Sequence, residues 1–149
     1  MAEVLFYHMT ESTLEDALPG LLERSVGRGW RAVVQTGSEE RRDALDQHLW
    51  IFRDDSFLGH GTDHEPFAAE QPVLLTTGDA NPNHANIRFL VDGAVPPDLA
   101  GYERAVFLFD GHDDGQVGAA REHWKTMKAA GHAVTYWQQS EDRRWERKA

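Results

Sequence analysis

Three basic side chains near the C-terminal end of the chain have a spacing that brings them together. Arg121, Lys125 and Lys128 follow one another at i, i+4 and i+7, which on an α-helix puts them in one stripe. Trp124 lies beside that stripe. An aromatic surface edged by three cations suits a small, acidic and partly apolar ligand, such as a disordered acidic peptide.

The charge of the rest of the chain sets this stripe apart. Residues 1–120 carry 8 Lys and Arg against 21 Asp and Glu, whereas residues 121–149 carry 7 against 4. The balances of −13 and +3 sum to the net charge of −10 for the 149 residues. An acidic surface repels phosphates, so we expect little direct DNA binding.

The last ten residues contain the basic side chains of a competing hypothesis, direct DNA binding by the C-terminal end. These side chains are Arg143, Arg144, Arg147 and Lys148. Three acidic neighbours interrupt them and weaken the hypothesis.

The helix that carries the basic stripe also has an apolar face, and two interpretations of it are open. Val117, Trp124 and two further apolar residues recur at i, i+3, i+7 and i+10. The face is either core, with the cations a solvated flank that the helix dipole favours, or part of a binding site. The charge reversal favours a site that consists of Val117, Arg121, Trp124, Lys125 and Lys128.

A second group of large apolar side chains lies near an aspartate-rich connection. Trp50, Phe57 and Leu58 form this group. Exposed aromatic clusters mark partner surfaces, but the same residues could instead pack over the edge of a sheet.

An enzyme is the alternative from a different class. Asp110, His112 and Asp113 lie between an apolar strand and a helix, where α/β enzymes bind phosphate. The Asp110–Asp113 loop could therefore serve a hydrolase or a nucleotide-binding protein. Its carboxylates would repel a phosphate, and neither a glycine-rich dinucleotide loop nor a P-loop is present.

Metal and cofactor chemistry has little support. His60, Asp63 and His64 could be drawn as metal ligands, but glycines and a proline around them predict a solvated loop. The chain has no cysteine, which excludes a disulfide scaffold, a thiolate zinc site and a cysteine nucleophile. We expect no metal and no cofactor.

Alternating strands and helices predict one three-layer, Rossmann-like α/β domain with a mostly parallel central sheet. We expect this domain over residues 1–139 and a polar, flexible tail over residues 140–149. A capping box at Ser12 and Glu15 begins the first helix, which Pro19 interrupts or kinks. The N-terminus indicates a strand rather than a signal peptide, and no apolar run approaches the roughly 18–20 residues of a membrane span. We expect a cytoplasmic protein.

Several short motifs, in order along nearly the whole chain, resemble the chi subunit family of bacterial DNA polymerase III. The resemblance rests on the following residues: Phe6-Tyr7, Gly29-Trp30-Arg31, Leu45-Asp46 with Leu49-Trp50, Asp55-Ser56-Phe57 with His60, and Arg121, Trp124, Lys125 and Ala130-Gly131. Gly59 departs from the pattern, since a proline commonly precedes the histidine.

The resemblance implies a non-catalytic subunit with a Rossmann-like fold, no nucleotide chemistry and two partners. One partner is the acidic C-terminal tail of the single-stranded-DNA-binding protein, which ends in an apolar Phe and would bind the helix carrying Arg121, Trp124 and Lys125. The other is the psi subunit of the clamp loader, which would bind near Trp50 and Phe57.

Overall fold

The structure is a computed structural model that describes residues 2–51 and 58–149. Its strands are β1 Glu3–Met9, β2 Ala32–Gln35, β3 His60–Thr62, β4 Val73–Thr76, β5 Ile87–Leu90, β6 Arg104–Asp110, β7 Ala133–Gln139 and β8 Trp145–Arg147. Its helices are α1 Leu14–Gly27, α2 Glu39–Ile51 and α3 Asp114–Ala129, with a single 3-10 turn at Ala68–Glu70.

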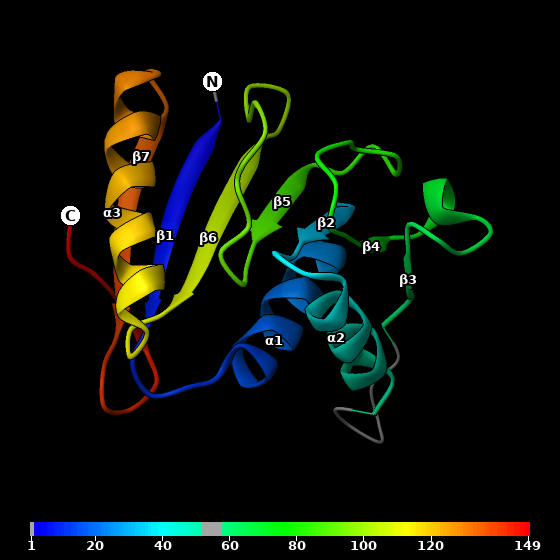
Figure 1. The fold of residues 1–149 in the computed structure, drawn as a ribbon, viewed down its shortest axis with the longest axis horizontal. Coiled ribbons are helices and arrows are strands. Elements are labelled where there is room, and N and C mark those ends of the chain that lie inside the picture. Colours follow the sequence, from blue (N-terminus) through cyan, green and yellow to red (C-terminus); the bar gives the residue numbers. More distant parts are fainter. Residues whose placement is uncertain (1, 52–57) are drawn as a thin grey trace.

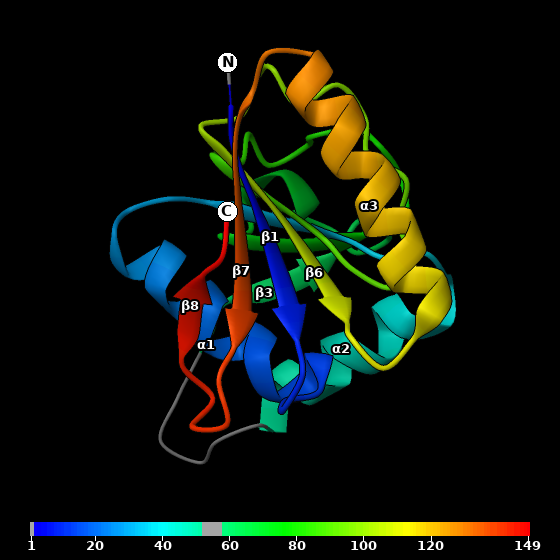
Figure 2. The ribbon, with the colours of Figure 1, turned by 90° about the vertical axis from the view of Figure 1, so that its left-hand side faces the viewer.

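The described strands form one sheet in the order β3-β4-β2-β5-β6-β1-β7-β8. Every neighbouring pair is parallel except β7 and β8. Helices α1 and α2 lie on one side of this sheet and α3 on the other (Figures 1 and 2). The predicted three-layer α/β fold with a mostly parallel sheet is confirmed.

The alternation of side chains along β1 explains the three layers. Leu5 and Met9 point into a core shared with α1 and α2, whereas Val4 and Phe6 point into a second core shared with α3. Phe6 stacks on Phe107 of the neighbouring β6, with ring centroids 4.6 Å apart. Strand β1 is therefore buried on both faces, as expected of a central parallel strand.

Helix α1 begins one residue later than the predicted capping box. Thr13 is the N-cap, and its hydroxyl accepts from the backbone N–H of Asp16, whose carboxylate accepts in return from the N–H of Thr13. The prediction of Ser12 was wrong because Gln139, at the end of β7, donates to the Ser12 hydroxyl. Its other amide atom, Oε1, accepts from the N–H of Ser12 and of the two residues before it.

Pro19 lies inside α1, and a side chain from α2 compensates for the hydrogen bond that it cannot make. The carbonyl of Glu15, four residues earlier, lacks its helical donor because proline has no N–H. His48 Nε2 lies 2.7 Å from that carbonyl and donates to it. The contact joins the two helices on this face of the sheet.

Residues 58–62 differ from the solvated loop that the sequence indicated, whereas His64 lies in an exposed turn as expected. His60 begins the edge strand β3 and is buried, with Nδ1 2.7 Å from the carbonyl of Leu58 and Nε2 3.0 Å from the carbonyl of Asp46. Glycines and prolines predicted a loop, but pairing with β4 and packing under Trp50, 4.3 Å away between ring centroids, bury this short segment.

The polar tail expected at residues 140–149 contributes the antiparallel strand β8. Trp145 of β8 stacks on Tyr7, with ring centroids 4.6 Å apart. A strand of three residues is too short to give a periodic signal, which explains why the pattern alone indicated a flexible tail. In residues 2–51 and 58–149, no helix is long and apolar enough to cross a membrane.

Candidate functional site

The residues predicted to bind an acidic peptide line one open groove beside α3. The groove has a volume of about 690 Å³. It is lined by His8, Phe109, Val117, Gly118, Ala120, Arg121, Glu122, Trp124, Lys125, Tyr136 and Ala149. We call it the α3 groove. Four of the five predicted residues line it, and the fifth, Lys128, lies outside with its Nζ 5.3 Å from the Trp124 ring centroid.

Local sequence determines how α3 presents these side chains. Asp113 caps the helix by accepting from the N–H of Gln116, and the chain leaves the helix at Gly131, which has a positive φ of 87°. Ala120 and Met127 face the core, while Val117 and Trp124 are only half-buried. The apolar face of α3 is thus shared between the core and the groove, and the role of its groove side as a binding site stays a prediction.

Aromatic contacts position Trp124 in the groove. Its ring meets Phe6 of β1 edge-on, with centroids 5.5 Å apart, and Tyr136 of β7 edge-on at 5.9 Å. Both partners belong to strands of the sheet, so these contacts leave the indole little freedom to move. The wall against which an apolar side chain would pack is therefore preorganised.

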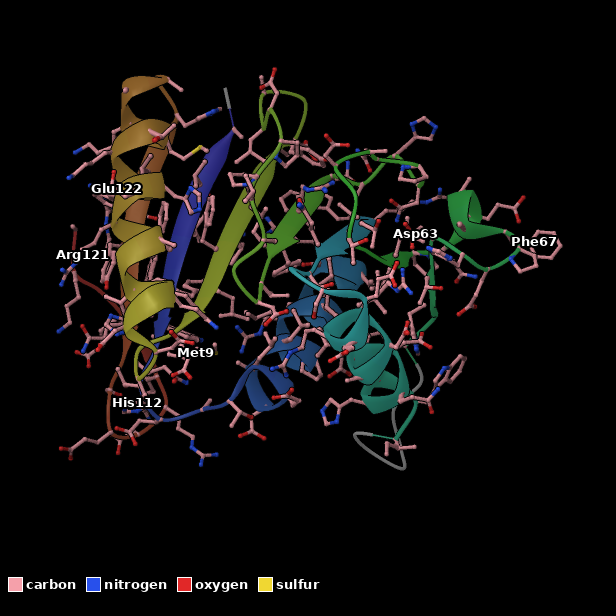
Figure 3. All side chains as sticks on the ribbon, viewed as in Figure 1. Met9, Asp63, Phe67, His112, Arg121 and Glu122 are labelled. Carbon is pink, nitrogen blue, oxygen red and sulfur yellow. The ribbon has the colours of Figure 1, made fainter. Side chains whose placement is uncertain are left out.

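The two cations of the groove, Lys125 and Arg121, differ in whether the side chain has an ion-pair partner. Lys125 lies 3.5 Å from Glu122 on the solvent side of the helix. Arg121 is exposed, and its side chain makes no hydrogen bond or ion pair with any residue in the described part of the chain. Figure 3 shows Arg121 beside α3, at the left-hand margin of the molecule. A free guanidinium beside an apolar wall can hold a carboxylate through two parallel hydrogen bonds.

Sequence reasoning missed two residues of the groove, His8 and Tyr136. The His8 Nδ1 lies 2.6 Å from the Tyr136 hydroxyl. Burial lowers the pKa of His8, with contributions from His112 and Arg121, and burial raises the pKa of Tyr136. Nothing local in the sequence relates these residues, because only the pairing of β1 with β7 brings them together.

The second predicted surface is placed only in part. Trp50 is 52% exposed at the end of α2, whereas Leu58 is 4% exposed and packs in the core, where it offers little surface to a partner. Phe57 lies outside the described residues. Two further exposed apolar residues occur at this edge of the sheet: Ile51 and Phe67.

Phe67 was not predicted to belong to this surface, although the pair Pro66-Phe67 within a polar segment could have indicated an exposed aromatic residue. It is 72% exposed and has a positive φ of 65°, a backbone conformation that bulky residues rarely adopt. Figure 3 shows it projecting beyond β3, at the end of the molecule opposite Arg121. We call Trp50, Ile51 and Phe67 together the β3-edge surface.

The side chains of the Asp110–Asp113 loop make hydrogen bonds within the protein. Asp110 accepts from the N–H of His112, Asp113 caps α3, and His112 Nε2 lies 2.8 Å from the carbonyl of Thr10. These bonds explain why acidic residues and a histidine stand at this turn without any need for a substrate.

A cavity of about 340 Å³ opens beside this loop at the carboxyl ends of β1 and β6. Its charged lining consists of four carboxylates, the residues Glu11, Glu15, Asp92 and Asp110, with Arg41 and His112. Arg41 is paired with both Glu15 and Asp92. The position is the usual one for a nucleotide in α/β folds, but the balance of charge disfavours phosphate.

Among the described residues, no cluster of three or more His, Asp or Glu side chains is arranged to hold a metal ion. His60 and Asp63, which were weighed as ligands, are engaged elsewhere: His60 Nε2 lies 3.3 Å from Asp46, and Asp63 accepts from the Thr76 hydroxyl.

The order of strands and the three layers define a Rossmann-like α/β domain, and the α3 groove beside its sheet is aromatic and edged by cations. Residues 1–135 match the family model described as DNA polymerase III chi subunit, HolC. The chain therefore belongs to the DNA polymerase III chi subunit family, as the resemblance predicted.

Two curated relatives carry the same description. The probable DNA polymerase III subunit chi of Rickettsia prowazekii (strain Madrid E) is 26% identical over 100 residues, which cover 67% of this chain and 59% of that protein. The DNA polymerase III subunit chi of Pseudomonas aeruginosa is 28% identical over 88 residues, which cover 59% of this chain and 61% of that protein. The match thus spans about three-fifths of the length of both relatives. The family and both relatives are named for a subunit of DNA polymerase III.

Proposed function

We propose that this chain is a non-catalytic chi subunit that links the clamp loader, through psi or an equivalent subunit, to the acidic C-terminal tail of single-stranded-DNA-binding protein. The observation that carries the proposal is the free guanidinium of Arg121 in an aromatic groove on an otherwise acidic protein. The proposed setting is the bacterial cytoplasm.

The chemistry of the α3 groove supports an acidic, apolar-tipped ligand. Arg121 would hold a carboxylate in a bidentate manner, and Lys125 would attract the acidic residues that precede it. Val117 and Trp124 would receive the phenylalanine ring, whose burial contributes roughly 1.5–3 kcal/mol. Exposed ion pairs add about 0–1 kcal/mol each.

The cost of ordering the tail limits the affinity. A disordered peptide loses conformational freedom when it binds, which offsets part of the burial energy. The expected dissociation constant is therefore in the micromolar range, about −8 kcal/mol or weaker. Such weak binding suits a contact that must form and break repeatedly.

The proposed psi-side contact rests on the β3-edge surface. Trp50 and Phe67 are large, exposed and apolar, and such residues are enriched where partners bind. The surface and the α3 groove lie at opposite ends of the molecule (Figure 3). One chain could therefore hold both partners at once.

A binding experiment with matched variants tests the proposal. A fluorescent peptide that copies the last residues of the cognate single-stranded-DNA-binding protein is titrated with wild type, Arg121→Ala and Trp50→Ala. We expect Arg121→Ala to weaken binding and Trp50→Ala to leave it unchanged. Equal affinity for all three proteins would show that the tail does not bind in the α3 groove.

The same preparation discriminates the enzyme alternative. A hydrolase or nucleotide-binding protein that used the Asp110–Asp113 loop would bind a nucleotide or a divalent metal without any partner. Binding of ATP or Mg²⁺ to the isolated chain, lost in Asp110→Asn, would favour that alternative.

A further inference from the structure

The wall of the α3 groove contains a hydrogen-bonded pair whose presence the tail-binding scheme does not explain. His8 of β1 and Tyr136 of β7 line the groove together with Arg121. The distance of 2.6 Å between His8 Nδ1 and the Tyr136 hydroxyl is that of a strong hydrogen bond. A groove that only needed an apolar wall would not require this polar pair.

The imidazole of His8 is held in one orientation. Its ring stacks on Phe109, with centroids 4.9 Å apart and planes 28° from parallel. On another side it lies against Gly111, where an added Cβ would come within 2.3 Å of Nε2. The absence of a side chain at Gly111 is therefore what makes room for the ring.

The single proton of the Tyr136 hydroxyl gives the pair two states. When His8 is neutral with its proton on Nε2, Nδ1 accepts from the hydroxyl, and the phenol oxygen presents only lone pairs to the groove. When a proton from solvent binds His8, Nδ1–H donates to the phenol oxygen and the O–H is released to donate elsewhere. Protonation thus converts Tyr136 from an acceptor to a donor and adds a positive charge beside it.

Burial and two neighbouring groups lower the pKa of His8 and so favour its neutral form in the free groove. Burial is the largest cause that lowers the pKa of His8, and His112 on the β6–α3 turn and Arg121 on α3 lower it further. Asp110, at the end of β6, opposes them. A carboxylate that entered the groove would add a second, closer negative charge and would favour the protonated pair.

We propose that His8 and Tyr136 form a proton-linked ligand pair for a carboxylate of the acidic peptide, so that the peptide binds together with a proton from solvent. The inference rests on the proposed function, because it assigns further ligands to the same groove. Arg121 and the released Tyr136 hydroxyl would converge on that carboxylate, with the charge of His8 behind the hydroxyl.

Calorimetric titration of the acidic peptide into the full chain tests the pair. The affinity is expected to rise about three- to tenfold from about pH 8 to about pH 6, a range in which the peptide carboxylates stay ionised. Between these limits the measured heat should depend on the ionisation enthalpy of the buffer, which reports uptake of up to about one proton per peptide.

Variants separate the pair from other histidines. Tyr136→Phe and His8→Gln should each bind the peptide at about pH 8 and lose most of the pH dependence. His123→Gln is the matched control, because His123 lies on α3 but stacks on Phe107, 5.1 Å away between ring centroids, and does not line the groove. It should keep the full pH dependence. Tyr136→Phe deletes one oxygen atom and carries the test alone if His8→Gln fails to fold.

The outcomes for this pair and for the proposed function are distinct. Tail binding by wild type without pH dependence or proton uptake would overturn the role of the pair and leave the proposed function intact. Proton uptake that persisted in Tyr136→Phe would overturn it equally. Absence of tail binding at every pH would overturn the proposed function, and the pair's role with it.

Discussion

The two proposed binding surfaces, the α3 groove and the β3-edge surface, differ in shape and in charge. The groove is concave, and its aromatic wall is braced by rings from β1 and β7 and edged by the free Arg121. The β3-edge surface projects apolar side chains, and its neighbours Glu65 and Glu70 are exposed and acidic. The groove therefore suits an anionic ligand and the edge suits an apolar or basic one.

This difference teaches that net charge alone does not identify the partners. A chain with a net charge of −10 would be expected to avoid acidic ligands, yet the unpaired side chain of Arg121 lines the α3 groove. We therefore expect the local charge at each surface, rather than the total charge, to decide which partner binds there.

The largest expected effect comes from reversing the charge at the groove. Arg121→Glu should weaken tail-peptide binding about 100-fold, because a charge-assisted hydrogen bond worth about 1.5–3 kcal/mol is replaced by repulsion. Anisotropy titration measures the loss. Trp50→Ala, at the other surface, should bind the peptide as wild type does, and an equal loss in both variants would break the comparison.

The next largest effect concerns the packing of His8 against Gly111 at the wall of the α3 groove. Gly111→Ala should lower the free energy of unfolding by about 2 kcal/mol, because the new Cβ would meet His8 Nε2 at 2.3 Å and the backbone carbonyl of Met9 at 2.7 Å. Denaturant unfolding measures this change.

The chain offers a matched control for that substitution. Gly20 lies inside α1 with nothing within 4 Å of an added Cβ, so Gly20→Ala should stabilise by about 0.5–1 kcal/mol. If Gly111→Ala were equally harmless, the close approach of His8 to this turn would be wrong.

Much of the fold could be predicted from the sequence because it depends on local signals. Apolar runs gave the central strands, and Asp113 and Gly131 gave the limits of α3. The errors came from contacts between residues far apart in the sequence. Gln139 binds the Ser12 hydroxyl, so Ser12 does not cap α1, and pairing with β4 makes the segment around His60 a buried strand rather than a loop.

In the candidate site, too, the residues with a local sequence signal could be predicted and those brought together by the sheet could not. Arg121 and Lys125 could be found because helical spacing puts them in one stripe, and Trp124 because it lies beside that stripe. His8 and Tyr136 could not, since they are 128 residues apart in the sequence and meet only through the order of the sheet. Leu58 was misplaced because an apolar residue beside a loop has the same local pattern whether it is exposed or in the core.

A smaller effect concerns salt. Tail affinity should fall several-fold between about 50 and about 300 mM salt, because Arg121, Lys125 and Lys128 are exposed and are screened over about 10 Å or less. Binding of an apolar partner at the β3-edge surface should change little over the same range. Titrations at the two salt concentrations measure both, and equal salt dependence at the two surfaces would contradict their assignment to different partner chemistries.

The smallest effect is on stability against pH. His8 and His123 have lowered pKa values in the folded protein, mainly because of burial. The unfolded chain then binds more protons, so the free energy of unfolding should fall as the pH drops through 6.5, the ordinary value for histidine. Thermal unfolding of wild type and of the double variant His8→Gln, His123→Gln measures this, and the variant should show a shallower fall. If the double variant lost stability with falling pH as steeply as wild type does, other titratable groups would be the cause of the loss.

The measurement that tests the central claim most directly is calorimetric titration of an acidic, phenylalanine-ended tail peptide into wild type and Arg121→Ala at low and moderate salt. The α3 groove predicts micromolar binding to wild type that weakens with salt and falls at least about tenfold in Arg121→Ala. No binding to wild type at low salt, or equal binding to both proteins, would contradict the assignment of the groove to the acidic tail.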